Sequence, residues 1–275
     1  MHGDVSDAFD TFERTGWATN DAAAYEQVFG PITRHPIDAL LDAARVGPGT
    51  RLLDVATGPG YVAARAAERG AKATGLDRSA QMLAIARARH PSLTFVEGDA
   101  EALGLPPASF DAAVASFCLL HLARPERCVA ELARVVAPGG RVAVTVWNTP
   151  DHARLFGIVL EAVRAAGAVP PAELPAGPDF FQFADDANMT RVLADAGLRD
   201  PEVQTIDWRT PVSSADELWH GFTAGSVRTR ALLIGQSPEV QHAIRNELAR
   251  RLEEFRDGTT FEVPVSVKLG SATAP

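Results

Sequence analysis

Apolar runs and helical patterns alternate along the chain between residues 51 and 147. Each apolar run is short and shows no polar alternation, which is typical of a strand buried on both faces. The segments between the runs carry apolar residues at helical spacing. This alternation predicts a parallel sheet covered by helices on both faces. The expected strands are RLLDVA, AKATGLD, SLTFVEGD, FDAAVASF and RVAVTVW.

The helices between these strands have recognisable ends. YVAARAAERG is closed by Gly70, and Ser79 can cap the helix SAQMLAIARAR. Pro125 lies in the first turn of PERCVAELARVV, where a proline is tolerated. We expect the Pro-Gly-Gly at 138–140 to stop this last helix.

The pattern changes on both sides of this region. Residues 5–46 predict helices, the last of them beginning near Pro31. After residue 150 the pattern predicts a helix, a proline-rich loop, another helix, the strand PEVQTIDWRT, two or three helices and a final strand, FEVPVSVKLGS. We expect one structural domain overall, made of an N-terminal helical cover (1–47), a ligand-binding core (48–150) and a C-terminal part (151–275). This last part would complete the sheet and supply a helical substrate cap.

Composition narrows the possible partners. The 275 residues carry a formal net charge of −9, so nucleic acid and anionic membrane surfaces are poor first guesses. No run of 18 apolar residues occurs, and the N-terminus lacks the basic and apolar regions of a secretory signal. The two cysteines, Cys118 and Cys128, have no metal-ligand spacing. We expect a cytoplasmic protein, monomeric or homodimeric, with no metal site.

The loop after the first strand has two possible interpretations. Residues 58–63, GPGYVA, fit the dinucleotide pattern G-x-G-x-x-A, and Asp77 follows at a distance suited to a ribose. This match alone is weak, and it leaves a nicotinamide-dependent oxidoreductase as one hypothesis. The chain shows no Tyr-x-x-x-Lys set for hydride chemistry.

Acidic residues end three successive predicted strands. They are Asp54, Asp77 and Asp99, and the carboxyl edge of a parallel sheet is where open α/β folds bind ligands. Asp54 would face a pyrophosphate unfavourably, so it favours a ligand that carries positive charge or donor groups. An aspartate at a strand end can also serve only to cap a turn, so the set carries more weight than any single member.

Residues 51–147 resemble the class I S-adenosylmethionine (SAM)-dependent methyltransferases of the type 11, ubiquinone- and menaquinone-biosynthesis-like, small-molecule branch. The resemblance rests on the acid and glycines of the first loop, on GDA at 98–100, on FD at 110–111 and on HLARPERCVAELARVVAPGG. It implies a Rossmann-like, seven-stranded, mostly parallel sheet with an N-terminal helical lid and a helical insertion before the last strand. It also implies SAM as the cofactor of the core, with S-adenosylhomocysteine as the product. The chain departs from the family at Ala56, where a glycine is usual and where alanine disfavours a positive φ.

The resemblance also implies roles for the residues at the sheet edge. Asp54 would help to hold the ammonium group, Asp77 the ribose hydroxyls, and Asp99 the adenine edge. The expected cofactor-binding residues are Asp54, Ala56, Thr57, Gly58, Gly60, Asp77, Arg78, Met82, Asp99, Ala100, Ser116 and Phe117. Met82 lies on an apolar helix face, where core packing is the ordinary role.

Methyl transfer from a sulfonium depends mainly on alignment of nucleophile, methyl group and sulfur. A general base is needed only where the nucleophile must lose a proton, and His121 is the best-placed candidate. A structural hydrogen bond is the more ordinary role for this histidine.

We expect the acceptor to be a small molecule, apolar or aromatic and secondary-metabolite-like, held in a pocket outside the sheet. The candidate substrate-binding residues are Trp17, Tyr25, His152, Phe180 and Trp219. These side chains could instead fill the core beneath the helices. A non-methylating protein of the same fold, either a binder or a cyclase-type enzyme, remains an alternative function.

Overall fold

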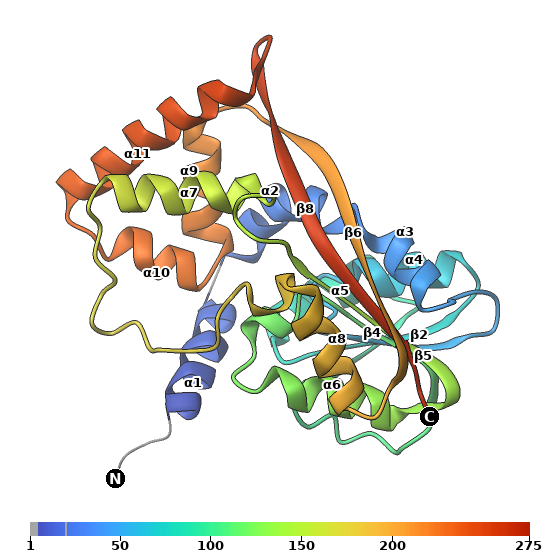
Figure 1. Cartoon of the computed structure of the whole chain (residues 1–275). Helices are drawn as coiled ribbons and strands as arrows, with labels where there is room; N and C mark the ends of the chain where they lie inside the picture. The colour runs from blue at the N-terminus through green and yellow to red at the C-terminus, as the bar shows by residue number, and fades with distance from the viewer. Residues whose placement is uncertain (1–4, 20) are drawn as a thin grey trace. The chain divides into compact units, whose positions relative to one another are not determined.

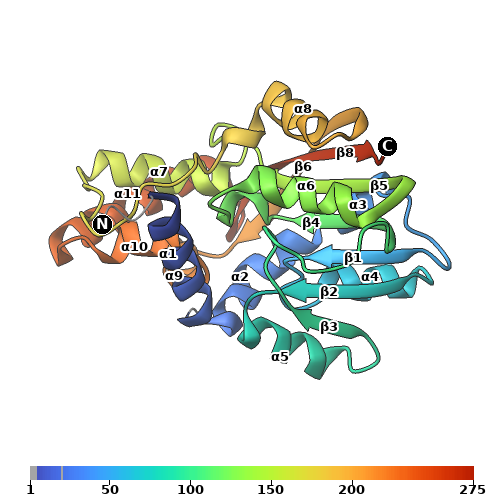
Figure 2. The ribbon, with the colours of Figure 1, turned by 90° about the horizontal axis from the view of Figure 1, so that it is seen from below.

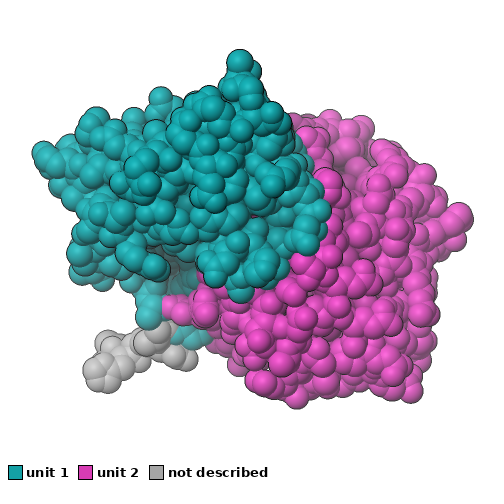
Figure 3. Space-filling model, turned by 45° about the horizontal axis from the view of Figure 1, so that its top comes forward, with its two compact units in different colours: residues 1–32, 148–176, 207–266 teal, residues 33–147, 177–206, 267–275 magenta. Residues whose placement is uncertain are grey.

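A computed structural model describes residues 5–19 and 21–275 and divides the chain into two compact units. Unit 1 is formed from residues 1–32, 148–176 and 207–266, and unit 2 from residues 33–147, 177–206 and 267–275. Figure 3 colours them separately. The division cuts across the three expected segments, because residues 33–47 belong to the sheet unit and residues 207–266 join the N-terminal helices.

Unit 2 is built on a parallel sheet. The strand order is β3-β2-β1-β4-β5-β8-β6; β1 to β5 are parallel, and β8 is antiparallel to β5. These strands are β1 (Arg51–Val55), β2 (Lys72–Asp77), β3 (Thr94–Glu97), β4 (Phe110–Ser116), β5 (Val136–Trp147), β6 (Arg199–Val212) and β8 (Thr260–Thr273). The expected mostly parallel, Rossmann-like sheet is confirmed, but in the described part of the chain it has eight strands rather than seven, because a short strand, β7 (Arg256–Asp257), pairs with β8. Figure 2 shows the parallel strands side by side.

Helices cover both faces of this sheet. One apolar layer joins β1, β4 and β5 to α6 (Pro125–Val135) and α8 (Asp186–Asp195). The other joins the sheet to α3 (Ile37–Ala43), α4 (Tyr61–Glu68) and α5 (Ala80–Arg89). Alternate residues of β1 enter opposite layers, Leu53 the first and Leu52 the second, which is why the strand lacks polar alternation.

Two expected helix boundaries are wrong. Pro31 does not begin a helix but lies in the last turn of α2 (Ala22–Arg34), where its missing N–H removes a single hydrogen bond near the helix end. The next helix, α3, starts after Pro36. At the other site, α6 ends at Val135 rather than at the Pro-Gly-Gly, because Val136 is already extended and starts β5.

Unit 1 is mainly helical (Figure 1). Its helices are α1 (Val5–Thr19), α2, α7 (Arg154–Ala165), α9 (Ala215–Gly225), α10 (Arg228–Ile234) and α11 (Pro238–Leu252). α11 packs on α7 and α9, and α9 packs on α10. A short hairpin joins β7 (Arg256–Asp257) to the start of β8. Within the described ranges, the helices are too short or too polar to span a bilayer.

Candidate cofactor-binding site

The loop after β1 has an unusual backbone. Ala56, Gly58 and Gly60 all have positive φ, of 57°, 54° and 85°. Ala56 therefore adopts the left-handed conformation that glycine takes readily, which costs an L-residue about 1–2 kcal/mol. A Cβ added to Gly58 would meet no atom within 4 Å, so the space in front of this residue is open. The loop is shaped to let a ligand approach its backbone.

Asp54 is a buried carboxylate with an unmet hydrogen-bonding capacity. Its Oδ2 accepts hydrogen bonds from the Thr57 hydroxyl at 2.5 Å and from the Ala63 amide at 3.1 Å. Its Oδ1 is buried and has no partner. Burial raises the pKa of Asp54 to about 7 against the opposing effect of both hydrogen bonds, and the charge of Asp77 raises it further. A cationic donor would satisfy this oxygen, so the site fits the ammonium group of SAM.

Asp77, the last residue of β2, ties the loop to the next helix. Its Oδ2 accepts from the Gly58 amide and its Oδ1 from the Ser79 amide, both at 2.8 Å. Burial raises the pKa of Asp77, and the two amide hydrogen bonds partly oppose that rise. Each carboxylate oxygen has a second lone pair, so Asp77 can still accept from two hydroxyls. This capacity fits a ribose.

The ends of β4 and β5 form a second part of the site. Phe117 has a φ of 52°, which is strained for a bulky residue. Its amide donates to the Thr145 carbonyl at 3.0 Å, and the Ser116 and Thr145 hydroxyls lie 3.2 Å apart. The Phe117 and Trp147 rings are 4.3 Å apart between centroids. Backbone strain held by such contacts is common at functional sites.

Trp147 is a residue of this edge that the sequence analysis did not select. It ends β5 as Ser116 ends β4, and its aromatic side chain at a strand end was the available signal.

The remaining expected cofactor residues have more ordinary surroundings. Asp99 follows β3 and accepts a hydrogen bond from the Glu101 amide at 2.9 Å, as a turn cap does. Ala100 is buried in the apolar layer beside α6. Met82 is buried, and its amide donates to the capping Ser79 hydroxyl, which confirms the expected cap. Arg78 is half-buried beside Asp77, and the charge of Arg78 partly opposes the rise that burial causes in the pKa of Asp77.

His121 and Phe180 are brought together in unit 2. His121 ends a short 3₁₀ turn (Leu119–His121) after β4, and its ring centroid lies 6.3 Å from that of Phe180, edge to face. Nearby, Cys118 and Cys128 are buried free thiols in contact with each other. That contact and burial raise the pKa of Cys128, so the thiol is held in its unreactive form.

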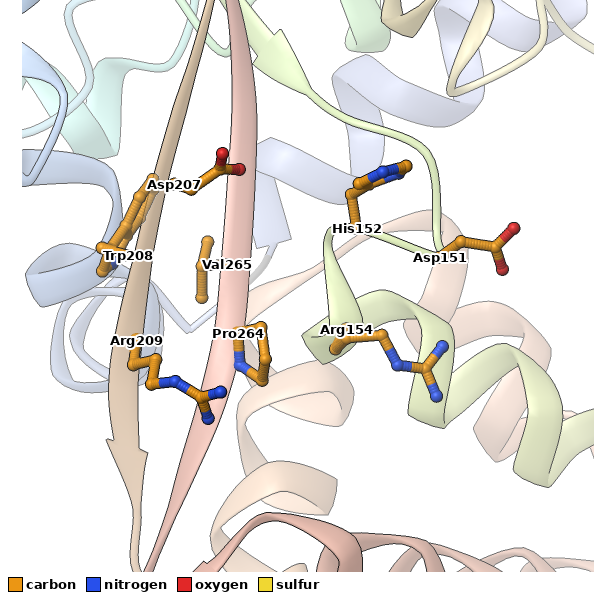
Figure 4. A pocket seen from close by; sticks show the side chains of 8 residues that line it. All are labelled: Asp151, His152, Arg154, Asp207, Trp208, Arg209, Pro264 and Val265. Atoms are coloured by element: carbon orange, nitrogen blue, oxygen red, sulfur yellow. The ribbon is translucent and has the colours of Figure 1, made fainter.

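The other substrate candidates lie in unit 1 and occupy three places. Trp17 and Tyr25 meet edge to face, with ring centroids 5.6 Å apart. Trp219 is buried beneath the Arg245 guanidinium, 4.6 Å from the ring centroid. His152 lines an open pocket of about 460 Å³, and its Nδ1 lies 3.0 Å from the Thr149 hydroxyl. Figure 4 shows this pocket, which is lined by Asp151, His152, Arg154, Asp207, Trp208, Arg209, Pro264 and Val265.

Comparisons with known proteins show the family to which this chain belongs. Residues 53–144 match the family described as a methyltransferase domain. Over 215 residues the chain is 30% identical to a demethylmenaquinone methyltransferase of Renibacterium salmoninarum, a match that covers 75% of this chain and 86% of the relative. The chain belongs to the class I SAM-dependent methyltransferases. Its cofactor is accordingly SAM, and the methyltransferase is of the menaquinone-biosynthesis type.

Solved structures share the fold of this methyltransferase. A Bacillus halodurans protein assigned as a methyltransferase superimposes with a TM-score of 0.56 at 18% identity, covering 87% of this chain and 98% of that one. The [4+2]-cyclase SpnF superimposes with a TM-score of 0.51 at 22% identity, covering 87% and 80%. At these identities the likeness concerns the fold alone.

Proposed function

We propose that this methyltransferase transfers the methyl group of SAM to a small, apolar or aromatic acceptor. The observation that carries the proposal is the buried, unpartnered Oδ1 of Asp54 beside the open glycine loop. That pairing suits a cationic amino acid end and not a pyrophosphate. The relatives named demethylmenaquinone methyltransferases suggest a quinone as the first acceptor to test.

Each group of expected cofactor residues would contact a different part of SAM. Asp54 would hold the ammonium group, and Asp77 would accept from the ribose hydroxyls with its remaining lone pairs. The open space in front of Gly58 would allow close approach of the ligand, and Gly60 would supply the left-handed turn of the same loop. Asp99 and Ala100 would contact the adenine, and Ser116 and Phe117 would lie near the methionine part. The other expected cofactor residues around these are Ala56, Thr57, Arg78 and Met82.

SAM, when bound, supplies an electrophilic methyl group on a positively charged sulfur. The protein's main contribution would be to align the acceptor and to exclude water. Where the acceptor is a hydroxyl, the His121 imidazole would take the proton released. The candidate acceptor-binding residues remain Trp17, Tyr25, His152, Phe180 and Trp219. We further propose that the protein acts in the cytoplasm as a monomer or homodimer.

A turnover assay tests this proposal. Purified protein is incubated with SAM and with a panel of acceptors, led by a short-chain demethylmenaquinone in its oxidised and reduced forms. Mass spectrometry follows S-adenosylhomocysteine and the acceptor. We expect S-adenosylhomocysteine to form only with an acceptor that gains 14 mass units (one CH₂). An acceptor that isomerises without gaining mass, while SAM is not consumed, would contradict methyl transfer and indicate a cyclase-type activity.

A further inference from the structure

A fully buried carboxylate lies on α1, in unit 1. Glu13 is 0% exposed, although α1 carries exposed charges elsewhere. Its Oε2 accepts a hydrogen bond from the Trp17 indole Nε1 at 3.2 Å, one helical turn further along. Its Oε1 lies 3.5 Å from Nε of Arg228, the first residue of α10. One side chain thus joins an aromatic residue of its own helix to a cation of another.

This arrangement is a poor source of stability. Burying a carboxylate and a guanidinium costs desolvation energy that their attraction barely offsets, and apolar residues of similar size usually do as well or better. Arg228 is held in place a second time, because its guanidinium lies 4.3 Å from the centroid of the Phe9 ring. Because Glu13 and Arg228 are fixed in place but add little to the free energy of unfolding, we infer that they serve to orient a neighbouring side chain.

The residue so oriented is Trp17. Its half-exposed ring meets the edge of Tyr25, which stacks on Phe29, and Phe29 meets the buried Phe222 of α9. Trp17 is therefore the partly exposed end of an aromatic row that runs into the core of unit 1. Its one polar atom is engaged by Glu13, so the ring offers a ligand only its apolar faces.

We propose that Glu13 is a positioning residue for the methyl acceptor. It fixes the rotamer of Trp17, and the fixed indole face receives a flat ring of the acceptor by stacking. The inference rests on the proposed function, in which Trp17 and Tyr25 line the acceptor site. It adds that recognition at Trp17 depends on ring orientation and not on a hydrogen bond from the indole to the acceptor.

Variants on α1 test whether Glu13 orients Trp17 or only stabilises the fold. Glu13→Ala removes the acceptor of the indole N–H, whereas Glu13→Gln keeps an amide oxygen there. With a short-chain demethylmenaquinone, we expect Glu13→Ala to raise the acceptor KM about tenfold and leave the KM for SAM within about twofold. Glu13→Gln should recover most of the acceptor KM. Arg14→Ala is the matched control, because Arg14 forms an exposed ion pair with Asp10 on the same helix and should change neither constant.

A double-mutant cycle tests whether Glu13 acts through Trp17. In a Trp17→Ala background, Glu13→Ala should raise the acceptor KM no further. An additive effect in that background would overturn the proposal. So would a Glu13→Ala variant that melts at a lower temperature but keeps the acceptor KM of the wild type, because Glu13 would then be structural only.

A measurement without turnover separates this inference from the proposed function. The indole ¹⁵N–¹H signal of Trp17, assigned with Trp17→Phe, should shift when the short-chain demethylmenaquinone is added to the SAM-loaded protein. In Glu13→Gln the same shift should persist, and in Glu13→Ala it should weaken. A shift without S-adenosylhomocysteine formation would contradict methyl transfer and retain the role of Glu13. An indole signal that stays unchanged at millimolar acceptor would overturn the inference.

Discussion

Asp54 is held at a cost to the protein's own stability. Its pKa is raised from 3.8 to about 7 because the carboxylate is buried and because the charge of Asp77 lies nearby. A raised acid pKa favours the protonated folded state, so this residue's contribution to stability is complete below about pH 4. It is then lost as the pH rises through about 7. A ligand that supplies a cationic donor would reverse that loss.

Replacing Asp54 tests whether its buried charge lowers the stability of the ligand-free protein while it strengthens SAM binding. Asp54→Asn removes the charge, so we expect the ligand-free variant to be about 1–3 kcal/mol more stable than the wild type at pH 8. Its free energy of unfolding should change less between pH 4 and pH 8, as measured by urea denaturation. Its SAM affinity should fall at least about tenfold.

Asp111→Asn is the control for this prediction. The pKa of Asp111 is lowered by its exposed ion pair with Arg51, so the variant should leave SAM affinity unchanged. A wild-type free energy of unfolding that stays flat from pH 4 to pH 8 would contradict the account of Asp54.

Ala56 carries backbone strain that glycine would relieve. The strain of a left-handed alanine is about 1–2 kcal/mol, and the added freedom of glycine in the unfolded chain costs about 0.4–1 kcal/mol. We therefore expect Ala56→Gly to raise the free energy of unfolding by about 0.5–1 kcal/mol, with SAM affinity kept within about threefold. Ala108→Gly, at an exposed loop residue with a φ of 54°, should give a similar gain. A lower melting temperature for Ala56→Gly would rule out strain at this position.

At the scale of elements, the β1–loop–α4 segment could be predicted because its signals are local. An apolar run, small loop residues and a capped helix follow one another within twenty residues. The order of β6 and β8 in the sheet could not, because strand pairing depends on partners that are distant in the sequence. The strained turn at Phe117 also left no signal in the sequence, because non-local contacts to Thr145 and Trp147 impose it.

The junction of β4 and β5 supplies an element-scale prediction. Thr145 is fully buried, and its side chain interacts with Ser116 and with the Phe117 amide. Thr145→Val keeps the shape but removes the hydroxyl, so we expect a loss of about 0.5–1.5 kcal/mol in the free energy of unfolding. SAM affinity should fall about threefold to tenfold as the end of β4 loosens. Thr94→Val, at an exposed position of β3, should change neither quantity. Wild-type SAM affinity in Thr145→Val would remove this junction from the cofactor site.

At the scale of the whole molecule, the proposed ligand contacts divide between the units. Every expected cofactor residue lies in unit 2, whereas Trp17, Tyr25, His152 and Trp219 lie in unit 1. Periodicity could predict which segments of unit 1 are helical, but not the end of α2 beyond Pro31. It could not show that residues 1–32, 148–176 and 207–266 pack together, because contacts between distant segments leave no periodic signal.

This division predicts an order of protection in hydrogen exchange. SAM alone should slow exchange in unit 2, at residues 54–63, 77–82 and 116–121. It should also stabilise the protein by about 2.7 kcal/mol at a concentration of 100 Kd. Adding an acceptor should extend protection to α1 and α2. Protection that begins in unit 1 with SAM alone would contradict the assignment of cofactor residues.

Calorimetric titration with SAM tests the central claim most directly. We expect the wild type to bind one SAM with micromolar affinity and to give no response to NADH. Asp77→Ala should bind SAM about 10–100 times more weakly, because it loses charge-assisted hydrogen bonds to the ribose. Unchanged affinity in that variant would remove Asp77 from the site. Micromolar binding of NADH, with no heat from SAM, would contradict the account as a whole.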